Sequence, residues 1–191
     1  MTIRTESRIT VAAAVSDVWA YIADVARWSE WAPTVLECRI RGGGTLQPGA
    51  WVEQRAKDLG FNHRRREQVT AVDAPNSMAF AGTMGTSVAR WGMEFEPAGE
   101  AHTDGHIDAR TEAHTDEHTD EHTNAMMWVE VDLANVMRAI PGRALQRQVQ
   151  RVSNIEMAAI KAAIESDAQS DAQSDAQSSP QADRHAGSGP P

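Results

Sequence analysis

The sequence predicts an α+β domain in which an antiparallel sheet is covered on one face by helices. Along the middle of the chain, apolar residues alternate with polar or small ones, which is typical of strands with one buried face. Near the start and again near the end, apolar residues recur at helical spacing. Because the strands follow one another and the helices lie at the chain ends, hairpin connections are favoured over a parallel sheet.

The first predicted elements are a strand and a helical stretch. Residues 3–11 alternate as a strand, and Ser16-Asp17 then offers the hydroxyl and carboxylate that cap helix N-termini. Apolar residues at helical spacing continue until Pro33, which ends the helical stretch.

The later strands are separated by turns that contain glycine and proline, such as Gly42-Gly43-Gly44. They are predicted at residues 36–40, 51–57, 64–72, 78–80, 91–95 and 127–133. In the first of them Cys38 alternates with Leu36 and Ile40, so we expect it to pack as a small hydrophobic residue.

The last predicted element is a long helix that follows the break at Pro141-Gly142 and runs from about residue 143 to residue 165. A helix with one apolar stripe packs that stripe against a sheet. The stripe includes Leu145, Val149, Val152, Ile155, Ala159, Ile160 and Ala163.

Two segments of tetrapeptide repeats lie outside this pattern. Residues 97–123 repeat units such as HTDE and hold eight acidic residues against one arginine, and residues 166–191 repeat SDAQ. Neither segment offers apolar side chains whose burial could offset the entropy lost on ordering. We therefore expect one domain at residues 1–165, with a low-complexity acidic, histidine-rich loop inserted at 97–123, and a disordered tail at 166–191.

The composition argues against several classes of protein. The net charge of −9 comes mostly from the two repeat segments, and no basic surface for nucleic acid stands out. No apolar run approaches the roughly 20 residues of a transmembrane segment. The single cysteine and the lack of a signal-peptide pattern favour a cytoplasmic location. Phosphate-loop, dinucleotide and nucleophile-elbow motifs are missing, so we expect no cofactor.

Four stretches carry a resemblance to a known superfamily. They are VSDVWAYIADVARWSEWAP at 15–33, LQPGA at 46–50, VTAVDAP at 69–75 and AAIKAAIE at 158–165. In this order they resemble the polyketide cyclase/dehydrase-like branch of the START-like (SRPBCC) superfamily, over about residues 3–165. The insertion at 97–123 and the C-terminal tail depart from that pattern.

The resemblance implies a helix-grip, Bet v 1-like fold. In this fold a seven-stranded antiparallel sheet curls around a long C-terminal helix, with two short helices after the first strand. It also implies a cavity between sheet and helix, in which members of the superfamily bind lipids, polyketides or other apolar compounds. Some members cyclise or dehydrate polyketides and others bind proteins, so the fold alone does not give the function.

Strand alternation and the helix stripe predict which side chains line the cavity. The alternative is that the same side chains fill an ordinary core. Ligand pockets are mostly apolar with a few placed polar groups. The predicted ligand-binding wall comprises Val52, Met78, Phe80, Trp91, Met93, Phe95, Met127, Val129, Val131, Val149 and Val152.

Three polar residues share the inward phase of the strands. Gln54, Arg65 and Glu67 are therefore candidates for acid–base chemistry, because a carboxyl group in an apolar cavity has a raised pKa. The alternative is that a β-bulge shifts the strand phase and turns all three to solvent, since a one-residue slip exchanges the two faces.

Two further features have both a functional and a structural interpretation. Trp28 and Trp31 are three residues apart, and they either form the mouth of a pocket or plug the junction between helices and sheet. The histidines of 97–123 recur every four residues, as zinc ligands on a helix do. Because the whole tetrapeptide repeats, tandem duplication explains this spacing, and we expect no metal site.

The sequence therefore supports three functional hypotheses. The first is a carrier, sensor or sequestering protein for an apolar or aromatic, lipid- or polyketide-like molecule. The second is an enzyme of the cyclase, aromatase or dehydratase type. The third is a protein-interaction module that uses the sheet or the acidic loop. A hydrophobic ligand is the expected partner, without nucleic acid, and the chain is expected to be a monomer or homodimer.

Overall fold

The structure is a computed structural model that describes residues 2–58, 61–84, 87–99, 122–132 and 142–178. In chain order its elements are β1 (Thr2–Val11), α1 (Val15–Ala23), the 3₁₀ helix η1 (Val25–Arg27), α2 (Trp28–Trp31), β2 (Val35–Ile40), β3 (Trp51–Asp58), β4 (Phe61–Asp73), β5 (Ser77–Met84), β6 (Ser87–Pro97), β7 (Thr123–Asp132) and α3 (Gly142–Ser178).

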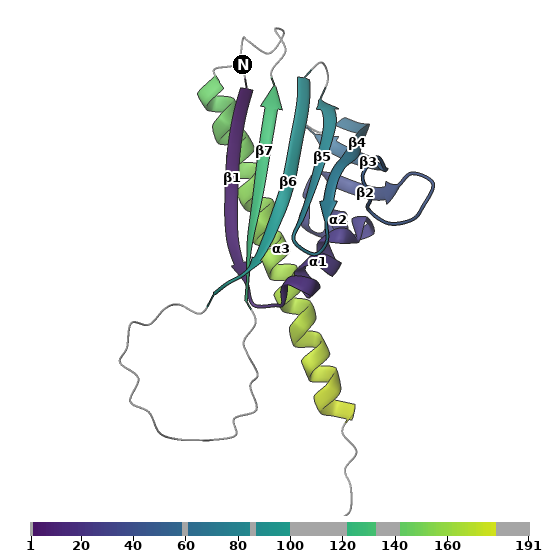
Figure 1. Cartoon of the computed structure of the whole chain (residues 1–191), viewed down its shortest axis with the longest axis vertical. Helices are drawn as coiled ribbons and strands as arrows, with labels where there is room; N and C mark the ends of the chain where they lie inside the picture. Colours follow the sequence, from purple (N-terminus) through teal and green to yellow (C-terminus); the bar gives the residue numbers. More distant parts are fainter. Residues whose placement is uncertain (1, 59–60, 85–86, 100–121, 133–141, 179–191) are drawn as a thin grey trace, which may run out of the picture.

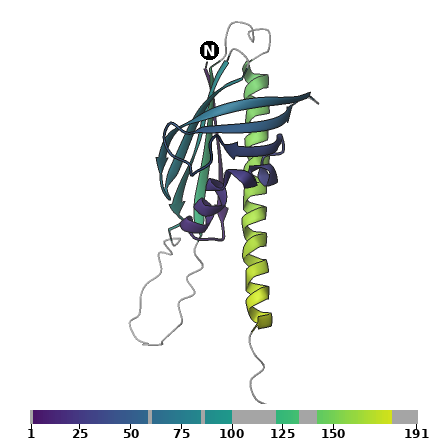
Figure 2. The ribbon, with the colours of Figure 1, turned by 90° about the vertical axis from the view of Figure 1, so that its right-hand side faces the viewer.

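The seven strands form one antiparallel sheet in the order β1-β7-β6-β5-β4-β3-β2. Figure 1 shows α3 running along the sheet on the side of β1, and Figure 2 shows α1 and α2 lying between α3 and the lower part of the sheet. The predicted fold class is confirmed, because the sheet has seven strands, two short helices follow β1, and a long helix ends the fold.

Alternation along each strand gives the sheet an inner face, toward α3, and an outer face. On β1, Ile3, Thr5 and Ser7 are buried on the inner face, whereas Arg4 and Glu6 are exposed. The period of two that defines a strand thus places one set of side chains against the helices and the other in solvent. A turn follows β2 where the sequence predicts it, at Gly42-Gly43-Gly44, and these glycines have φ values of 80–94°, in the left-handed region that favours glycine.

The main core lies between the lower half of the inner face and the helices. It joins strand residues to α1, α2 and α3, and a smaller cluster of Ile3 and Val131 lies toward the N-terminal end of α3, against Leu145. The largest fully buried side chains are Trp28, Phe80, Ile22, Met78, Met93, Met127, Met157 and Ile160.

Side chains of α3 also bond to the free edge of β1. Gln150 Nε2 donates to the carbonyl oxygen of Glu6 and to Ser7 Oγ, both at 2.8 Å. Ser7 Oγ in turn donates to Asn154 Oδ1 at 2.6 Å. An exposed strand edge is a template for unwanted pairing, and here the helix satisfies part of it.

The end of α3 corrects one prediction. The helix continues to Ser178, whereas the repeat composition predicts a disordered tail from residue 166. Ala and Gln of the SDAQ units are good helix formers, and no glycine or proline interrupts the chain before Pro180. Figure 1 shows these last turns extending beyond the sheet. Residues 179–191, and the repeat loop at 100–121, lie outside the described residues.

Local details of β2 and α1 also differ from the predictions. A β-bulge between Val35 and Glu37 shifts the phase of β2, so Leu36 is 43% exposed while Cys38 stays buried. Helix α1 begins one residue before the Ser16-Asp17 pair, and its N-cap has no side-chain hydrogen bond.

The buried side of α3 is also rotated relative to the predicted stripe. Ile155 is 47% exposed, and the helix buries Ile160 of that stripe together with Ser153, Met157 and Ile164, which the stripe did not include. These four follow one another at intervals of four and three residues, so they form a continuous stripe on a regular helix. The polar Ser153 within this stripe is what conceals it from a search for apolar spacing alone.

Candidate functional site

An aromatic cluster occupies the middle of the inner face. Phe80 on β5 and Trp91 on β6 are paired across the strands, and their rings stack with centroids 4.3 Å apart. Trp28 of α2 meets both rings edge-on, at 5.4 and 5.3 Å. Its Nε1 donates to the carbonyl oxygen of Ile22 at 2.8 Å, which fixes the orientation of the indole. Aromatic pairs in these geometries are favourable beyond the area they bury.

A chain of polar side chains lies beside this cluster. Arg65 Nε on β4 donates a hydrogen bond to Gln54 Oε1 on β3. Gln54 Nε2 donates to Glu67 Oε2 at 3.1 Å, and Trp91 Nε1 donates to the same oxygen at 3.0 Å. The three predicted polar candidates therefore lie together on the inner face, and Trp91 joins them to the aromatic cluster.

The position of Glu67 depends on Gly82 of the next strand. The two residues are paired in register, and a Cβ atom at Gly82 would lie 2.9 Å from Glu67 Cγ. The side chain of Glu67 thus crosses β5 through the space left by a missing side chain and reaches Trp91 on β6. A glycine inside a strand often marks such a close approach.

The electrostatics of the site favour neutral acids. Burial raises the pKa of the Glu67 carboxyl above its ordinary value, and this outweighs the lowering by Arg65 and by the hydrogen bonds from Trp91 and Gln54. Burial also raises the pKa of the Cys38 thiol to about 12, and the nearby Glu67 contributes to that rise. An unreactive thiol agrees with packing as a small hydrophobic residue.

The predicted wall divides into a packed part and a partly open part. Seven of its residues are no more than 3% exposed, as in an ordinary core: Val52, Met78, Phe80, Met93, Phe95, Met127 and Val131. Trp91, Val129, Val149 and Val152 are only partly buried. Glu67 and Arg65 belong to the same partly buried class, whereas Gln54 is 3% exposed.

Two valines of α3 behave differently from the rest of the helix stripe. Val149 and Val152 are partly exposed and, among the described residues, are not packed against either core cluster. Ala159 and Ala163, further along α3, do pack against the main core. Val149 and Val152 therefore keep apolar surface that the described core clusters do not cover.

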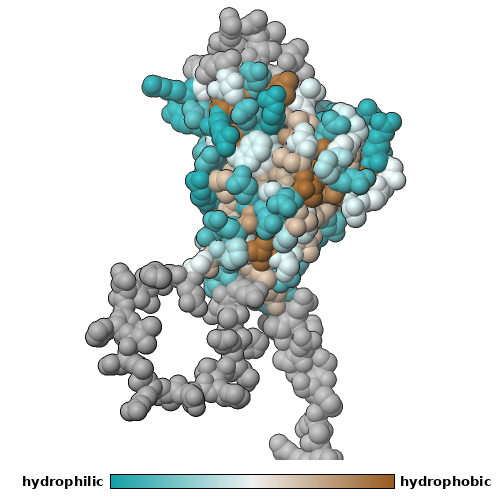
Figure 3. Space-filling view, viewed as in Figure 1, coloured by the Kyte–Doolittle hydropathy of each residue, from teal (hydrophilic) through white to brown (hydrophobic). Residues whose placement is uncertain are grey.

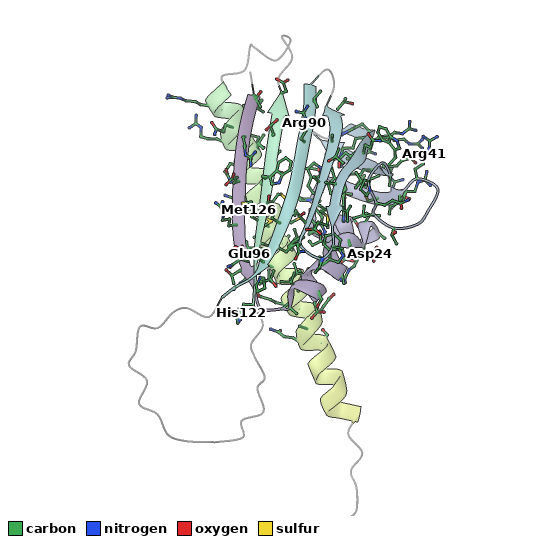
Figure 4. All side chains as sticks on the ribbon, in the orientation of Figure 1. Asp24, Arg41, Arg90, Glu96, His122 and Met126 are labelled. Atoms are coloured by element: carbon green, nitrogen blue, oxygen red, sulfur yellow. The ribbon has the colours of Figure 1, made fainter. Side chains whose placement is uncertain are left out.

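Three hollows are lined by described residues of the outer face and the rim. One of about 860 Å³ runs over β1, β7 and β6, and Figure 4 labels Glu96 and Met126 among its lining residues. A second, of about 610 Å³, is lined by residues that include Trp51 and Val88. A third, of about 170 Å³, lies at the rim beside Gln54 and Arg65. Figure 3 shows hydrophilic and hydrophobic areas interspersed on the face that is seen in Figure 1.

The tryptophan pair favours the structural interpretation. Trp28 and Trp31 are 1% and 3% exposed, and their ring centroids are 5.7 Å apart. They fill the junction between α2, the sheet and α3, and Trp28 thereby forms the base on which Trp91 rests.

The histidine repeats contribute nothing to the described site. His102, His106, His114 and His118 fall outside the described residues, and His122 is exposed. Within the described ranges, no group of three or more His, Cys, Asp or Glu side chains is arranged to hold a metal ion. None of the described helices combines the length and the apolar character that crossing a membrane requires.

Comparison with known proteins identifies the family of the chain. The family model described as polyketide cyclase/dehydrase and lipid transport matches residues 2–165. No curated protein matches the chain significantly.

Among solved structures, a START superfamily protein from Mycobacterium smegmatis superimposes with a TM-score of 0.62 at 12% identity, covering 86% of this chain and 98% of its own. Ara h 8.0201 superimposes with a TM-score of 0.60 at 13% identity, covering 87% and 99%. At these identities the likeness establishes the fold alone.

Proposed function

The chain belongs to the polyketide cyclase/dehydrase and lipid transport family, and on that premise we propose that it binds an apolar or aromatic small molecule on its inner face. In this role it is a carrier, sensor or sequestering protein. The binding site is the partly open part of the wall, between Trp91 and Val129 on the sheet and Val149 and Val152 on α3. The packed part of the wall forms the core beneath this site.

The observation that carries this proposal is the incomplete burial of apolar side chains on two facing elements. Apolar surface is favourable to remove from water, at about 25 cal/mol per Å². Val149 and Val152 nevertheless stay clear of the described core clusters, while Trp91 and Val129 of the opposite sheet keep accessible surface. The Trp91 ring stacks on Phe80 and is only partly buried, so it is an aromatic surface against which a planar ligand could pack.

Naphthalene binding to matched variants tests the proposal. Val149→Trp adds bulk at the proposed binding site between α3 and the sheet, whereas Val88→Trp adds the same bulk at a partly exposed position on the outer face. We expect the first variant to lose naphthalene binding and the second to retain the affinity of the unmodified chain, with both unfolding at similar temperatures. Loss in the Val88 variant alone, or no binding by the unmodified chain, contradicts the proposal.

A second candidate is a proton-transfer enzyme of the cyclase, aromatase or dehydratase type. One observation favours it, since Glu67 is a carboxyl group of raised pKa beside an aromatic surface, with Gln54 and Arg65 ordered around it. Enolisation of α-tetralone in heavy water provides the test. Deuterium incorporation beside the carbonyl that is faster with the unmodified chain than with Glu67→Gln supports an enzyme, and equal rates indicate binding alone.

A further inference from the structure

The two oxygens of the Glu67 carboxyl group have different surroundings. Oε2 accepts hydrogen bonds from Gln54 Nε2 and Trp91 Nε1. Oε1 accepts none from the described residues. It is also not among the fully enclosed polar atoms without a partner, which in the described chain are Thr5 Oγ1 and Trp31 Nε1. Oε1 therefore retains accessible surface, and it is the oxygen available to a bound molecule.

The neighbours of Glu67 fix which groups donate and which accept in these hydrogen bonds. Arg65 can only donate, so the Gln54 oxygen that receives its hydrogen bond is fixed as the acceptor, and the Gln54 amide group must turn toward Glu67. Trp91 Nε1 is likewise a donor only. With both donors directed at Oε2, a proton on the carboxyl group resides on Oε1.

From this geometry we propose that Glu67 meets its ligand as a neutral carboxylic acid that donates a hydrogen bond from Oε1 to a carbonyl oxygen. The proposal rests on the ligand site proposed above and narrows its ligand class to aromatic compounds that carry a ketone-type acceptor. Trp91 thus contributes twice, as a stacking surface and as the donor that leaves Oε1 to the proton.

The charges that face Glu67 permit a neutral carboxyl group. Arg65 on the same strand is the charged neighbour that favours ionisation, and burial outweighs it. Cys38 of β2 is the other titratable neighbour, and its thiol stays neutral because burial raises its pKa to about 12. From β3, β5 and β6 the facing residues are Gln54, Gly82 and Trp91, none of which titrates.

Glutamine at position 67 is a close mimic of the neutral acid. In Glu67→Gln the amide oxygen must take the position that receives the two donors, because an NH₂ group there would face donors only. The NH₂ group then occupies the position of Oε1 and donates to the ligand at every pH. Glu67→Leu keeps a similar volume but donates nothing.

The test compares α-tetralone with tetralin, which has the same ring skeleton without the carbonyl group. We expect the unmodified chain to bind the ketone about five- to tenfold more tightly than the hydrocarbon at the acidic end of the pH range in which it stays folded, as one buried hydrogen bond would give. This preference falls as Glu67 ionises on raising the pH. It persists across the whole pH range in Glu67→Gln and is lost in Glu67→Leu.

Each other outcome has a distinct meaning. A ketone preference in the unmodified chain that does not change with pH overturns the neutral-acid proposal, as does a Glu67→Gln variant that behaves like Glu67→Leu. Equal binding of the two compounds by all three proteins overturns the donor role while leaving the apolar site intact. If none of the proteins binds either compound, the ligand site itself is wrong and the donor role falls with it.

An infrared titration tests the protonation without any ligand. In the difference spectrum between the unmodified chain and Glu67→Gln, the carbonyl band of a protonated carboxylic acid is expected to persist above the ordinary glutamate pKa of about 4.3, because burial raises the pKa of Glu67. Replacement of this band by a pair of carboxylate bands at or below that ordinary value contradicts the proposal.

Discussion

Glu67 and Gly82 face each other across β4 and β5, and the missing side chain at Gly82 is what allows the Glu67 carboxyl group to reach Trp91 on the strand beyond. A single glycine thereby connects the polar chain of the inner face to its aromatic cluster. The predictions below follow from this connection and from the burial that surrounds it.

Gly82→Ala is expected to separate Glu67 from Trp91. The new Cβ atom would lie 2.9 Å from Glu67 Cγ and 3.0 Å from the backbone oxygen of Arg66, so the glutamate must move. The indole N–H resonance of Trp91 then shifts, and the free energy of unfolding falls by about 1 kcal/mol for the lost hydrogen bond. Gly99→Ala is the control, because no atom lies within 4 Å of its added Cβ. An unchanged Trp91 resonance in Gly82→Ala would show that the glycine is not needed.

Glu67→Gln is expected to change how stability depends on pH. Because burial raises the pKa of Glu67 in the folded state, the unmodified protein loses stability as the pH rises from the unfolded value of about 4.3 through the folded value. Glutamine cannot ionise, so the variant escapes this loss. Urea unfolding should therefore show a stability difference in favour of the variant that is small below about pH 4 and grows toward neutrality. A difference that is constant with pH would contradict the direction of the shift.

Trp28→Ala is expected to destabilise the fold strongly. The indole is 1% exposed, contacts Phe80 and Trp91, and donates to the Ile22 carbonyl oxygen. Truncating a buried aromatic side chain costs about 3–5 kcal/mol. Trp51→Ala, at a tryptophan that is 40% exposed on the outer face, should cost less than about 1 kcal/mol. Chemical denaturation of the two variants gives the comparison, and similar losses would argue against Trp28 as the base of the site.

Cys38 is expected to resist alkylation in the folded protein. Burial raises the pKa of its thiol to about 12, so the thiolate that reacts is scarce at about pH 8. Iodoacetamide should modify the native chain much more slowly than the chain in urea, where an unperturbed cysteine has a pKa of about 8.5. Equal rates would show that the thiol is neither buried nor held neutral.

The sequence pattern predicted a sheet covered by helices because its signals are local and repeated, whereas the seven-stranded helix grip was implied by the resemblance to the superfamily. Alternation, turn glycines and the final helix stripe each occur in the right order, and their sum specifies a sheet covered by helices. The predicted end of the last helix, at about residue 165, was wrong. The SDAQ units combine weak and strong helix formers, so their composition alone did not indicate whether they would be helical.

Strand phase decided which site residues could be predicted. β4 does contain a bulge, but it lies between Val69 and Ala71, beyond the polar candidates, so Arg65 and Glu67 keep their inward phase. The comparable bulge in β2 falls beside Leu36 and turns that residue outward. A bulge has no reliable sequence signal, so the same reasoning gives the correct face in one strand and the wrong face in the other.

The side-chain contacts between strands could not be predicted from the sequence. Gly82 is the residue that the sequence reasoning missed, because it lies two residues beyond the strand predicted at 78–80, whereas β5 continues to Met84. That Glu67 crosses over it to Trp91 depends on the register of three strands, which the sequence pattern does not specify. The division of the wall into packed and partly open parts likewise depends on how α3 is rotated.

The most direct test of the ligand site is a nuclear magnetic resonance titration with α-tetralone. We predict that the methyl resonances of Val129, Val149 and Val152 and the indole N–H resonance of Trp91 shift together with one dissociation constant, while those of Val88 and Trp51 on the outer face stay in place. Shifts confined to Val88 and Trp51, or no shifts at saturating ligand, would contradict a binding site on the inner face.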